Sequence, residues 1–162
     1  MSETKATARP EAGTLRGLVS MRMVRLFVLM RKSGILAQRR QFGLSETEWR
    51  IMTQLGEAAP LSLNGLADAM LQDRGQLSRA VKSMVERGLV TRQRKPGGPE
   101  IEIDLSDPGR TLYGRMVAWV HERDRALIAG IPQEDVAEVY RVLGTMMEQA
   151  QAMLDEEQRL GG

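Results

Sequence analysis

The distribution of apolar and polar residues along the chain predicts a mainly helical protein. From about Leu15 to Gln41 the pattern is helical, and between Met23 and Met30 apolar side chains fall on nearly every side of the expected helix. A helix that is apolar on several sides has to be covered on several sides. We therefore expect this first helix to be buried by its neighbours or by a second copy of the chain.

The second predicted helix begins with a capping pattern. Ser45 and Glu48 have the S-x-x-E spacing of a capping box, and Leu44 and Trp49 occupy the two positions of a hydrophobic staple. Pro60 follows the end of the helix. The staple makes Trp49 a core residue in our interpretation, rather than a binding residue.

A short third helix and a longer fourth helix follow. Apolar residues at helical spacing place the third between Leu63 and Met70. Asp73 is the expected N-cap of the fourth, with Gln76 at the position that closes a capping box. The expected apolar stripe of the fourth helix is Leu77, Val81, Met84 and Val85. Its opposite side presents small, polar and cationic residues, namely Gly75, Ser78, Arg79 and Lys82.

After Gly88 the period of the pattern changes from that of a helix to that of a strand. Leu89–Arg94 and Glu100–Leu105 read as two strands, and the glycine- and proline-rich residues 95–99 form the turn between them. A fifth helix is expected after Ser106 and a sixth after Pro132. The predicted fold class is therefore mainly α with a small β-hairpin wing, in other words a winged helix-turn-helix domain with a helical dimerisation region.

Charge adds a candidate function to this picture. The net charge of the 162-residue chain is only +2, but residues 74–95 carry seven arginines and lysines against one acid, Glu86. A basic block inside a near-neutral chain is typical of a surface that binds nucleic acid. A charge run is also commonly no more than a solvated face, so the block alone leaves both interpretations open.

Other features exclude several classes of protein. The longest apolar run, Leu26–Met30, is far shorter than a membrane span, and residues 1–13 read as a flexible tail rather than a secretory signal. The chain has no cysteine and one histidine, so we expect no metal site, no cofactor and no catalysis. We expect a cytoplasmic protein that is not an enzyme.

Four short motifs resemble the successive blocks of the MarR (multiple antibiotic resistance regulator) family. They are L-S-E-T-E-W at 44–49, L-A-D-A-M at 66–70, D-R-G-Q-L-S-R at 73–79 and E-R-G-L-V-T-R at 86–92. The resemblance implies a homodimer paired through its first, fifth and sixth helices, which binds a palindromic operator in double-stranded DNA. It further implies a repressor that is released by a small effector, suggested to be an aromatic carboxylate held between the first, second and fifth helices.

One stretch departs from the family pattern. Many members carry an Asp-x-Arg pair at the wing, whose arginine enters the minor groove. Here the corresponding residues are Gly97, Gly98 and Pro99. Insertion of the wing into the minor groove is therefore in doubt for this chain.

The candidate site residues fall into two groups. The expected DNA-binding residues are Arg74, Gln76, Ser78, Arg79, Lys82, Arg92, Arg94 and Lys95. For the three cations of the wing the alternative is cross-strand pairing with Glu100, Glu102 and Asp104. The ligand-binding candidates are Arg25, Trp119 and His121. For the last two the alternatives are core or dimer packing for Trp119, and surface exposure or a hydrogen-bonded core position for His121.

These observations favour a sequence-specific DNA-binding transcription regulator. Its DNA-binding domain is expected at residues 43–106, and its dimerisation region at 14–42 and 107–162. The alternative is a protein-interaction adaptor that keeps a winged-helix scaffold with little DNA binding.

Overall fold

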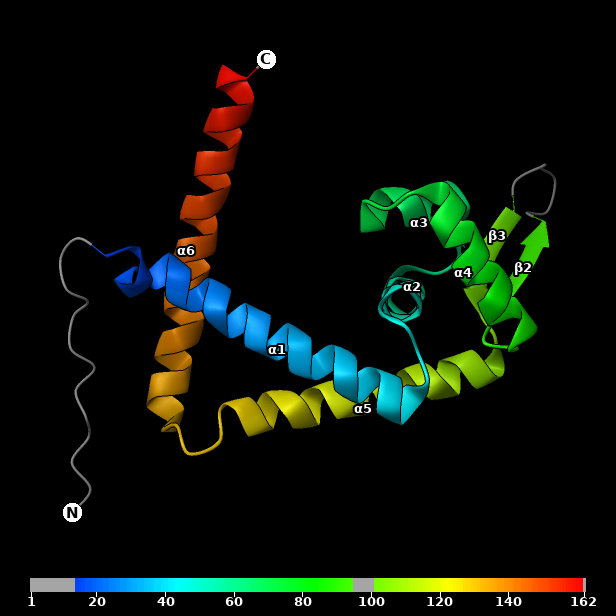
Figure 1. The fold of residues 1–162 in the computed structure, drawn as a ribbon, viewed down its shortest axis with the longest axis horizontal. Coiled ribbons are helices and arrows are strands. Elements are labelled where there is room, and N and C mark those ends of the chain that lie inside the picture. The colour runs from blue at the N-terminus through cyan, green and yellow to red at the C-terminus, as the bar shows by residue number, and fades with distance from the viewer. Residues whose placement is uncertain (1–13, 95–100, 162) are drawn as a thin grey trace. The chain divides into compact units, whose positions relative to one another are not determined.

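A computed structural model of the protein describes residues 14–94 and 101–161. The chain divides into two compact units, Met1–Gly114 and Arg115–Gly162, which are described separately. The mainly helical fold with a small antiparallel sheet confirms the predicted fold class (Figure 1).

The first unit holds most of the secondary structure. Its elements, in chain order, are the 3-10 helix η1 (Leu15–Gly17), α1 (Val19–Phe42), α2 (Glu46–Ala58), β1 (Leu61–Ser62), α3 (Leu63–Met70), α4 (Arg74–Glu86), β2 (Val90–Arg94) and β3 (Ile101–Leu105). Helix α5 (Asp107–Leu127) begins in this unit and ends in the second, which also contains α6 (Gln133–Leu160).

The start of α2 follows the predicted capping pattern. Ser45 Oγ accepts a hydrogen bond from the Glu48 amide at 3.2 Å, and Glu48 Oε2 accepts one from the Ser45 amide at 2.8 Å. Leu44 and Trp49 are both buried, and the edge of the Trp49 ring meets the Phe42 ring at a centroid distance of 5.5 Å. The interpretation of Trp49 as a core residue is therefore confirmed.

The sheet has three antiparallel strands in the order β1-β3-β2. The hairpin β2–β3 matches the two predicted strands and pairs Val90 with Leu105 and Arg92 with Ile103. Strand β1 was not expected from the sequence, because it is only two residues long and its partner on β3 lies some forty positions away, with Leu61 opposite Ile103. It ties the start of α3 to the sheet.

Helices α2, α3 and α4 pack against each other and against the sheet around one apolar core. The fully buried large side chains of this unit are Leu44, Ile51, Met52, Leu55, Leu66, Leu77, Val81, Met84 and Ile103. Burying a side chain of this size stabilises a fold by about 1.5–3 kcal/mol. Val85 was expected in this stripe, but it is 37% exposed because it follows Met84 directly and so lies about 100° round the helix from it.

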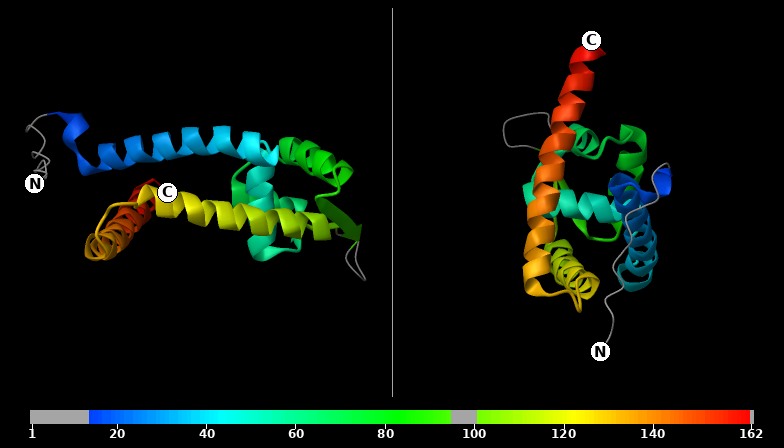
Figure 2. Two further views of the ribbon diagram at one scale, coloured as in Figure 1. Left: turned by 90° about the horizontal axis from the view of Figure 1, so that it is seen from below. Right: turned by 90° about the vertical axis from the view of Figure 1, so that its left-hand side faces the viewer.

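Helix α1 extends away from the cluster of α2, α3 and α4 (Figures 1 and 2). It ends at Gly43, whose left-handed conformation (φ 64°) lets its amide bond to the Arg39 carbonyl. Along its length the apolar side chains are exposed, among them Val24, Leu26 and Phe27. Within the first unit, the predicted apolar surface of this helix is thus left uncovered.

In the second unit α6 begins directly after Pro132, as predicted, and none of its described residues is buried. Its exposed apolar residues include Val139, Met147 and Leu154. Across the described part of the chain no helix combines the length and the apolar character needed to cross a membrane.

Candidate nucleic-acid interface

Helix α4 starts at the predicted N-cap. Asp73 Oδ1 accepts a hydrogen bond from the Gln76 amide at 3.0 Å, which satisfies one of the free N–H groups of the first turn. The return bond of a full capping box, from the Gln76 side chain to the Asp73 backbone, is absent among the described residues. The exposed Gln76 side chain is thus left available for other contacts.

The two sides of α4 differ in burial and charge. Leu77, Val81 and Met84 are buried against the core, whereas Arg79 and Lys82 are exposed on the opposite side. Neither cation has an ion-pair partner within residues 14–94 and 101–161. Ser78 is half-buried at the flank of the helix. Helix α4 therefore presents a cationic side to solvent while its other side is held rigidly by the core.

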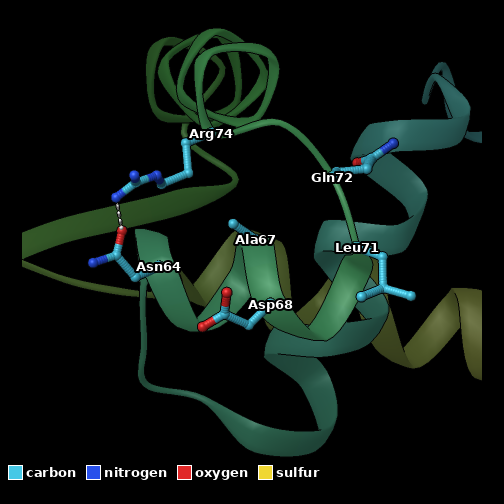
Figure 3. Close-up of a pocket in the computed structure, with 6 residues that line it drawn as sticks. All are labelled: Asn64, Ala67, Asp68, Leu71, Gln72 and Arg74. Carbon is cyan, nitrogen blue, oxygen red and sulfur yellow. Dashed lines mark hydrogen bonds between the residues drawn. The ribbon is translucent and has the colours of Figure 1, made fainter. Parts of the chain in front are cut away.

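Arg74 is held by a neighbour. Its Nη1 donates a hydrogen bond to Asn64 Oδ1 at 3.0 Å, so the start of α4 is linked to the start of α3 (Figure 3). The two residues line one side of an open pocket of about 520 Å³, together with Ala67, Asp68 and Leu71. Arg74 remains exposed, but its guanidinium has a fixed direction rather than a free one.

A hydrogen bond from α2 holds the turn between α3 and α4. Arg50 Nη2 donates to the Met70 carbonyl at 2.7 Å, which satisfies a carbonyl at the C-terminal end of α3. The next residue, Leu71, has a left-handed backbone (φ 50°) and is 93% exposed. A leucine in this conformation carries backbone strain.

The register of the hairpin bears on the alternative interpretation of Arg92 and Arg94. Arg92 lies opposite Ile103 and Arg94 opposite Ile101, so neither faces Glu102 or Asp104 directly. Instead Asp104 forms an ion pair with Arg110 at 2.7 Å. Arg92 and Arg94 therefore do not pair with Glu102 or Asp104; both are exposed and have no ion-pair partner in the described structure.

The remaining wing residues of the sequence analysis fall outside the described residues. They are Lys95, Gly97, Gly98, Pro99 and Glu100.

Part of this arrangement is similar in sequence to a known family. Residues 42–98, from the end of α1 to the wing, match the sequence model of the MarR family. Over its winged-helix region the chain is therefore similar to the MarR family.

Solved structures with the same fold come from several bacteria. The MarR/EmrR family transcriptional regulator from Acinetobacter sp. ADP1 is 20% identical, with a TM-score of 0.61 over 83% of this chain and 98% of that one. MepR, a transcription regulator of the Staphylococcus aureus multidrug efflux pump MepA, is 16% identical, with a TM-score of 0.74 over 82% of this chain and 98% of that one. A MarR family regulator from Rhodococcus sp. RHA1 is 23% identical, with a TM-score of 0.66 over 83% and 96% of the two chains.

These MarR-type relatives are transcription regulators and not enzymes. The chain therefore shares the fold of these regulators. No curated protein matches it. Among the residues that the structure describes, no group of three or more His, Asp or Glu side chains is arranged to hold a metal ion.

The ligand candidates of the MarR resemblance lie in different units. Arg25 is exposed on α1 in the first unit. In the second unit Trp119 is half-buried, and the guanidinium of Arg123 lies over its ring at 4.9 Å. His121 is exposed, and its carbonyl accepts a bond from Arg125 Nε at 3.3 Å. Arg123 is thus a cation beside Trp119 that the sequence analysis did not single out, although its i,i+4 spacing from Trp119 was a usable signal.

Two further residues of the MarR-type domain were missed because their partners are distant in sequence. Asn64 holds Arg74 across the helix-turn-helix, and Arg87 belongs to the basic block but reaches the start of α2. Nothing in the local pattern of residues 64 or 87 reveals these contacts.

Among the described residues, the groups with shifted pKa values form one exposed pair on α6. The hydrogen bond from Arg141 lowers the pKa of the Glu138 carboxyl and raises that of Arg141 itself. The pair lies three residues apart on the helix surface, so it stabilises α6 locally and has no part in the cationic side of α4.

Proposed function

We propose that the protein is a transcription repressor that binds a palindromic operator as a homodimer, with α4 of each subunit in the major groove. The observation that carries this proposal is the division of α4 into a buried apolar side and an exposed side with Arg79 and Lys82. A recognition helix needs this division, because base edges are read by side chains on a rigid support. Gln76 and Ser78 are the neutral candidates for base contacts on the same helix.

The wing supports the same proposal through phosphate contacts. Arg92 and Arg94 are exposed on β2 and free of carboxylate partners among the described residues. Unpaired cations beside a recognition helix favour binding to the DNA backbone, where each neutralised phosphate releases counterions. Arg74, held in place by Asn64, is a third backbone candidate, and Lys95 is a fourth from the sequence alone.

The homodimer is supported by the uncovered apolar side chains of α1 and α6. Solvent exposure of apolar patches on this scale marks an interaction surface. The two helices also carry opposite charge. Helix α1 has six arginines and lysines and no acid, whereas α6 has seven acids and two arginines. Opposite charges favour association between copies of the chain over association of either helix with itself.

The proposed domain boundaries are those expected from the sequence. Residues 43–106 form the DNA-binding domain, and residues 14–42 with 107–162 form the dimerisation region. A cytoplasmic location, where the operator is accessible, belongs to this proposal.

The proposed release mechanism uses a small aromatic carboxylate as the effector. An anion in an apolar cleft needs a cation, and the candidates are Arg25 and His121, with Trp119 as a stacking face. The Arg123 guanidinium over the Trp119 ring supports a cationic and aromatic environment in that part of α5. A coupling of about 1–3 kcal/mol between effector and operator is sufficient for a five- to hundredfold change in occupancy.

The experiment that tests the DNA-binding proposal is selection of bound duplexes from a random pool, followed by titration of the selected site at several salt concentrations. We expect a near-palindrome with half-sites about 10–10.5 base pairs apart, and a linear fall of log K with log salt. If no duplex is enriched and no salt-dependent binding is found at low ionic strength, the adaptor alternative is favoured instead.

A further inference from the structure

Arg87, the C-cap residue of α4, is an unusual member of the basic block because it is occupied inside the domain. Its Nη1 forms an ion pair with Glu48 Oε1 at 2.8 Å, and its Nη2 donates to the Gly43 carbonyl at 3.2 Å. The Glu48 side chain is only 11% exposed and that of Arg87 is 39% exposed. One guanidinium thus joins the end of α4 to the end of α1 and the start of α2.

Glu48 has two functions at this point. One carboxylate oxygen closes the capping box with the Ser45 amide, and the other accepts from Arg87. Both oxygens of a nearly buried carboxylate therefore accept hydrogen bonds, one from a neighbour in the sequence and one from a residue distant in the sequence. Loss of either partner leaves a buried charge without compensation, which is costly.

The junction that Arg87 contacts is itself rigid. Gly43 caps α1 in a left-handed conformation, Leu44 is fully buried, and the rings of Phe42 and Trp49 meet edge to face. The direction of α1 relative to α2 is therefore fixed by packing. Arg87 extends this fixed geometry to the C-terminal end of α4.

We propose that Arg87 is a positioning residue that sets the orientation of α4 relative to α1. That orientation in turn determines the operator spacing that the dimer accepts. This inference rests on the proposed function. If α1 contributes to the dimer, then the position of α4 relative to α1 determines the separation of the two recognition helices. Two recognition helices at a fixed separation accept one half-site spacing and reject others.

A substitution of Glu48, the partner of Arg87, distinguishes a positioning role of Arg87 from a direct DNA contact. Glu48→Gln removes a negative charge from a DNA-binding domain, so electrostatics alone predicts tighter binding to the polyanion. Glutamine at this position still closes the capping box, so α2 keeps its start. If Arg87 acts by positioning, Glu48→Gln weakens binding instead.

The test measures operator affinity, salt slope and spacing preference for the full-length chain and three variants, Glu48→Gln, Arg87→Met and the double variant. The matched control is Glu46→Gln, which makes the same change two residues away, where Glu46 pairs with Arg31 of α1 rather than with α4. Circular dichroism at the assay temperature gives the folded fraction of each protein, so that affinities refer to folded dimer.

We expect Glu48→Gln and Arg87→Met each to lower operator affinity about tenfold, with no further loss in the double variant. The preference for the selected spacing over sites one base pair longer or shorter falls, while the salt slope stays that of the wild type. Glu46→Gln leaves all three quantities unchanged or binds slightly more tightly.

Three results would overturn the proposal. A salt slope reduced by about 0.9 in Arg87→Met identifies a phosphate contact instead. Wild-type affinity and spacing preference in the folded Glu48→Gln protein identify a purely structural ion pair. If the wild-type chain binds no duplex, the proposed function is itself wrong, and Arg87 can have no effect on operator spacing.

Discussion

The α-carbon of Gly56 on α2 lies directly against the ring of Tyr113 on α5. A Cβ built at Gly56 would come within 2.2 Å of Tyr113 Cζ, so no larger residue fits while the ring keeps its place. We predict that Gly56→Ala lowers the free energy of unfolding by about 1–3 kcal/mol, the usual cost of overpacking. Urea unfolding measures this loss.

Two controls connect the loss to the ring. Gly114→Ala places the same methyl group on α5 where nothing lies within 4 Å, and it is expected to be neutral or stabilising by about 0.5–1 kcal/mol. In a Tyr113→Leu background, Gly56→Ala is expected to cost less than in the wild type. An equal loss in both backgrounds would show that Tyr113 is not the cause.

Replacement of Leu71, at the turn between α3 and α4, by glycine is expected to stabilise the protein. Its backbone is left-handed and its side chain is almost fully exposed, so Leu71→Gly relieves strain and loses little buried surface. We predict a gain of about 0.5–1 kcal/mol in the free energy of unfolding. The matched reverse change is Gly88→Ala, at φ 70° in open space, which is expected to destabilise by a similar amount. A loss of stability in Leu71→Gly would argue against strain at this turn.

The exposed cations of α4 are expected to contribute to DNA binding but not to the stability of the fold. Arg79→Ala and Lys82→Ala should weaken operator binding while the free energy of unfolding changes by less than about 0.5 kcal/mol. If the side chains contact phosphates, the salt slope falls by about 1 per charge removed. If one reads a guanine, discrimination at that base falls by about 1–3 kcal/mol.

The control for charge alone is Arg141→Ala, which removes a cation from α6 outside the cationic side of α4. It is expected to leave operator affinity within error of the wild type. Unchanged affinity in both α4 variants would remove the recognition-helix assignment.

The oligomeric state is expected to be a dimer at micromolar concentration, because α1 leaves its apolar side chains uncovered. Phe27→Glu, at an exposed apolar position of α1, should shift light scattering toward the monomer mass. Leu71→Glu makes the same kind of change at the turn between α3 and α4 and should leave the dimer intact. A monodisperse wild-type monomer would exclude the homodimer.

The proposed effector is tested by calorimetry and operator release against benzoates, cinnamates and their thioesters. We expect at least one aromatic carboxylate to bind and to lower operator affinity by five- to a hundredfold, through a coupling of about 1–3 kcal/mol. Arg25→Ala and His121→Ala should weaken this binding, because each removes a candidate partner of the carboxylate. Release that survives both substitutions would exclude the proposed pocket, and a panel without a binder would exclude the ligand class.

The features that could be predicted from the sequence are those that depend on neighbouring residues. The capping box of Ser45 and Glu48 spans three positions, so its spacing alone identifies the start of α2. The pairing of the same Glu48 with Arg87 spans 39 positions and left no trace in the local pattern. The two-residue strand β1 was missed for the same reason, since its register is decided by β3.

The faces of the elements were less predictable than their boundaries. Val85 is apolar and adjacent to the buried Met84, but the helical period turns it toward solvent. The alternative interpretation of Arg92 and Arg94 paired them with acids across the hairpin, whereas the register places isoleucines opposite them. Pairing across a hairpin depends on a register that the strand pattern alone does not determine.

The position of β2 at the edge of the sheet has a consequence for solubility. Edge strands offer free backbone groups to which a strand of another molecule can add, and such addition leads to aggregation. Arg92 and Arg94 place two cations on this edge strand, so copies of the chain repel each other where their sheets would otherwise join. We therefore expect the same two charges to oppose edge-to-edge aggregation in the absence of DNA. Lysine replacements, which keep the charge, are the safer substitutions for studying the wing.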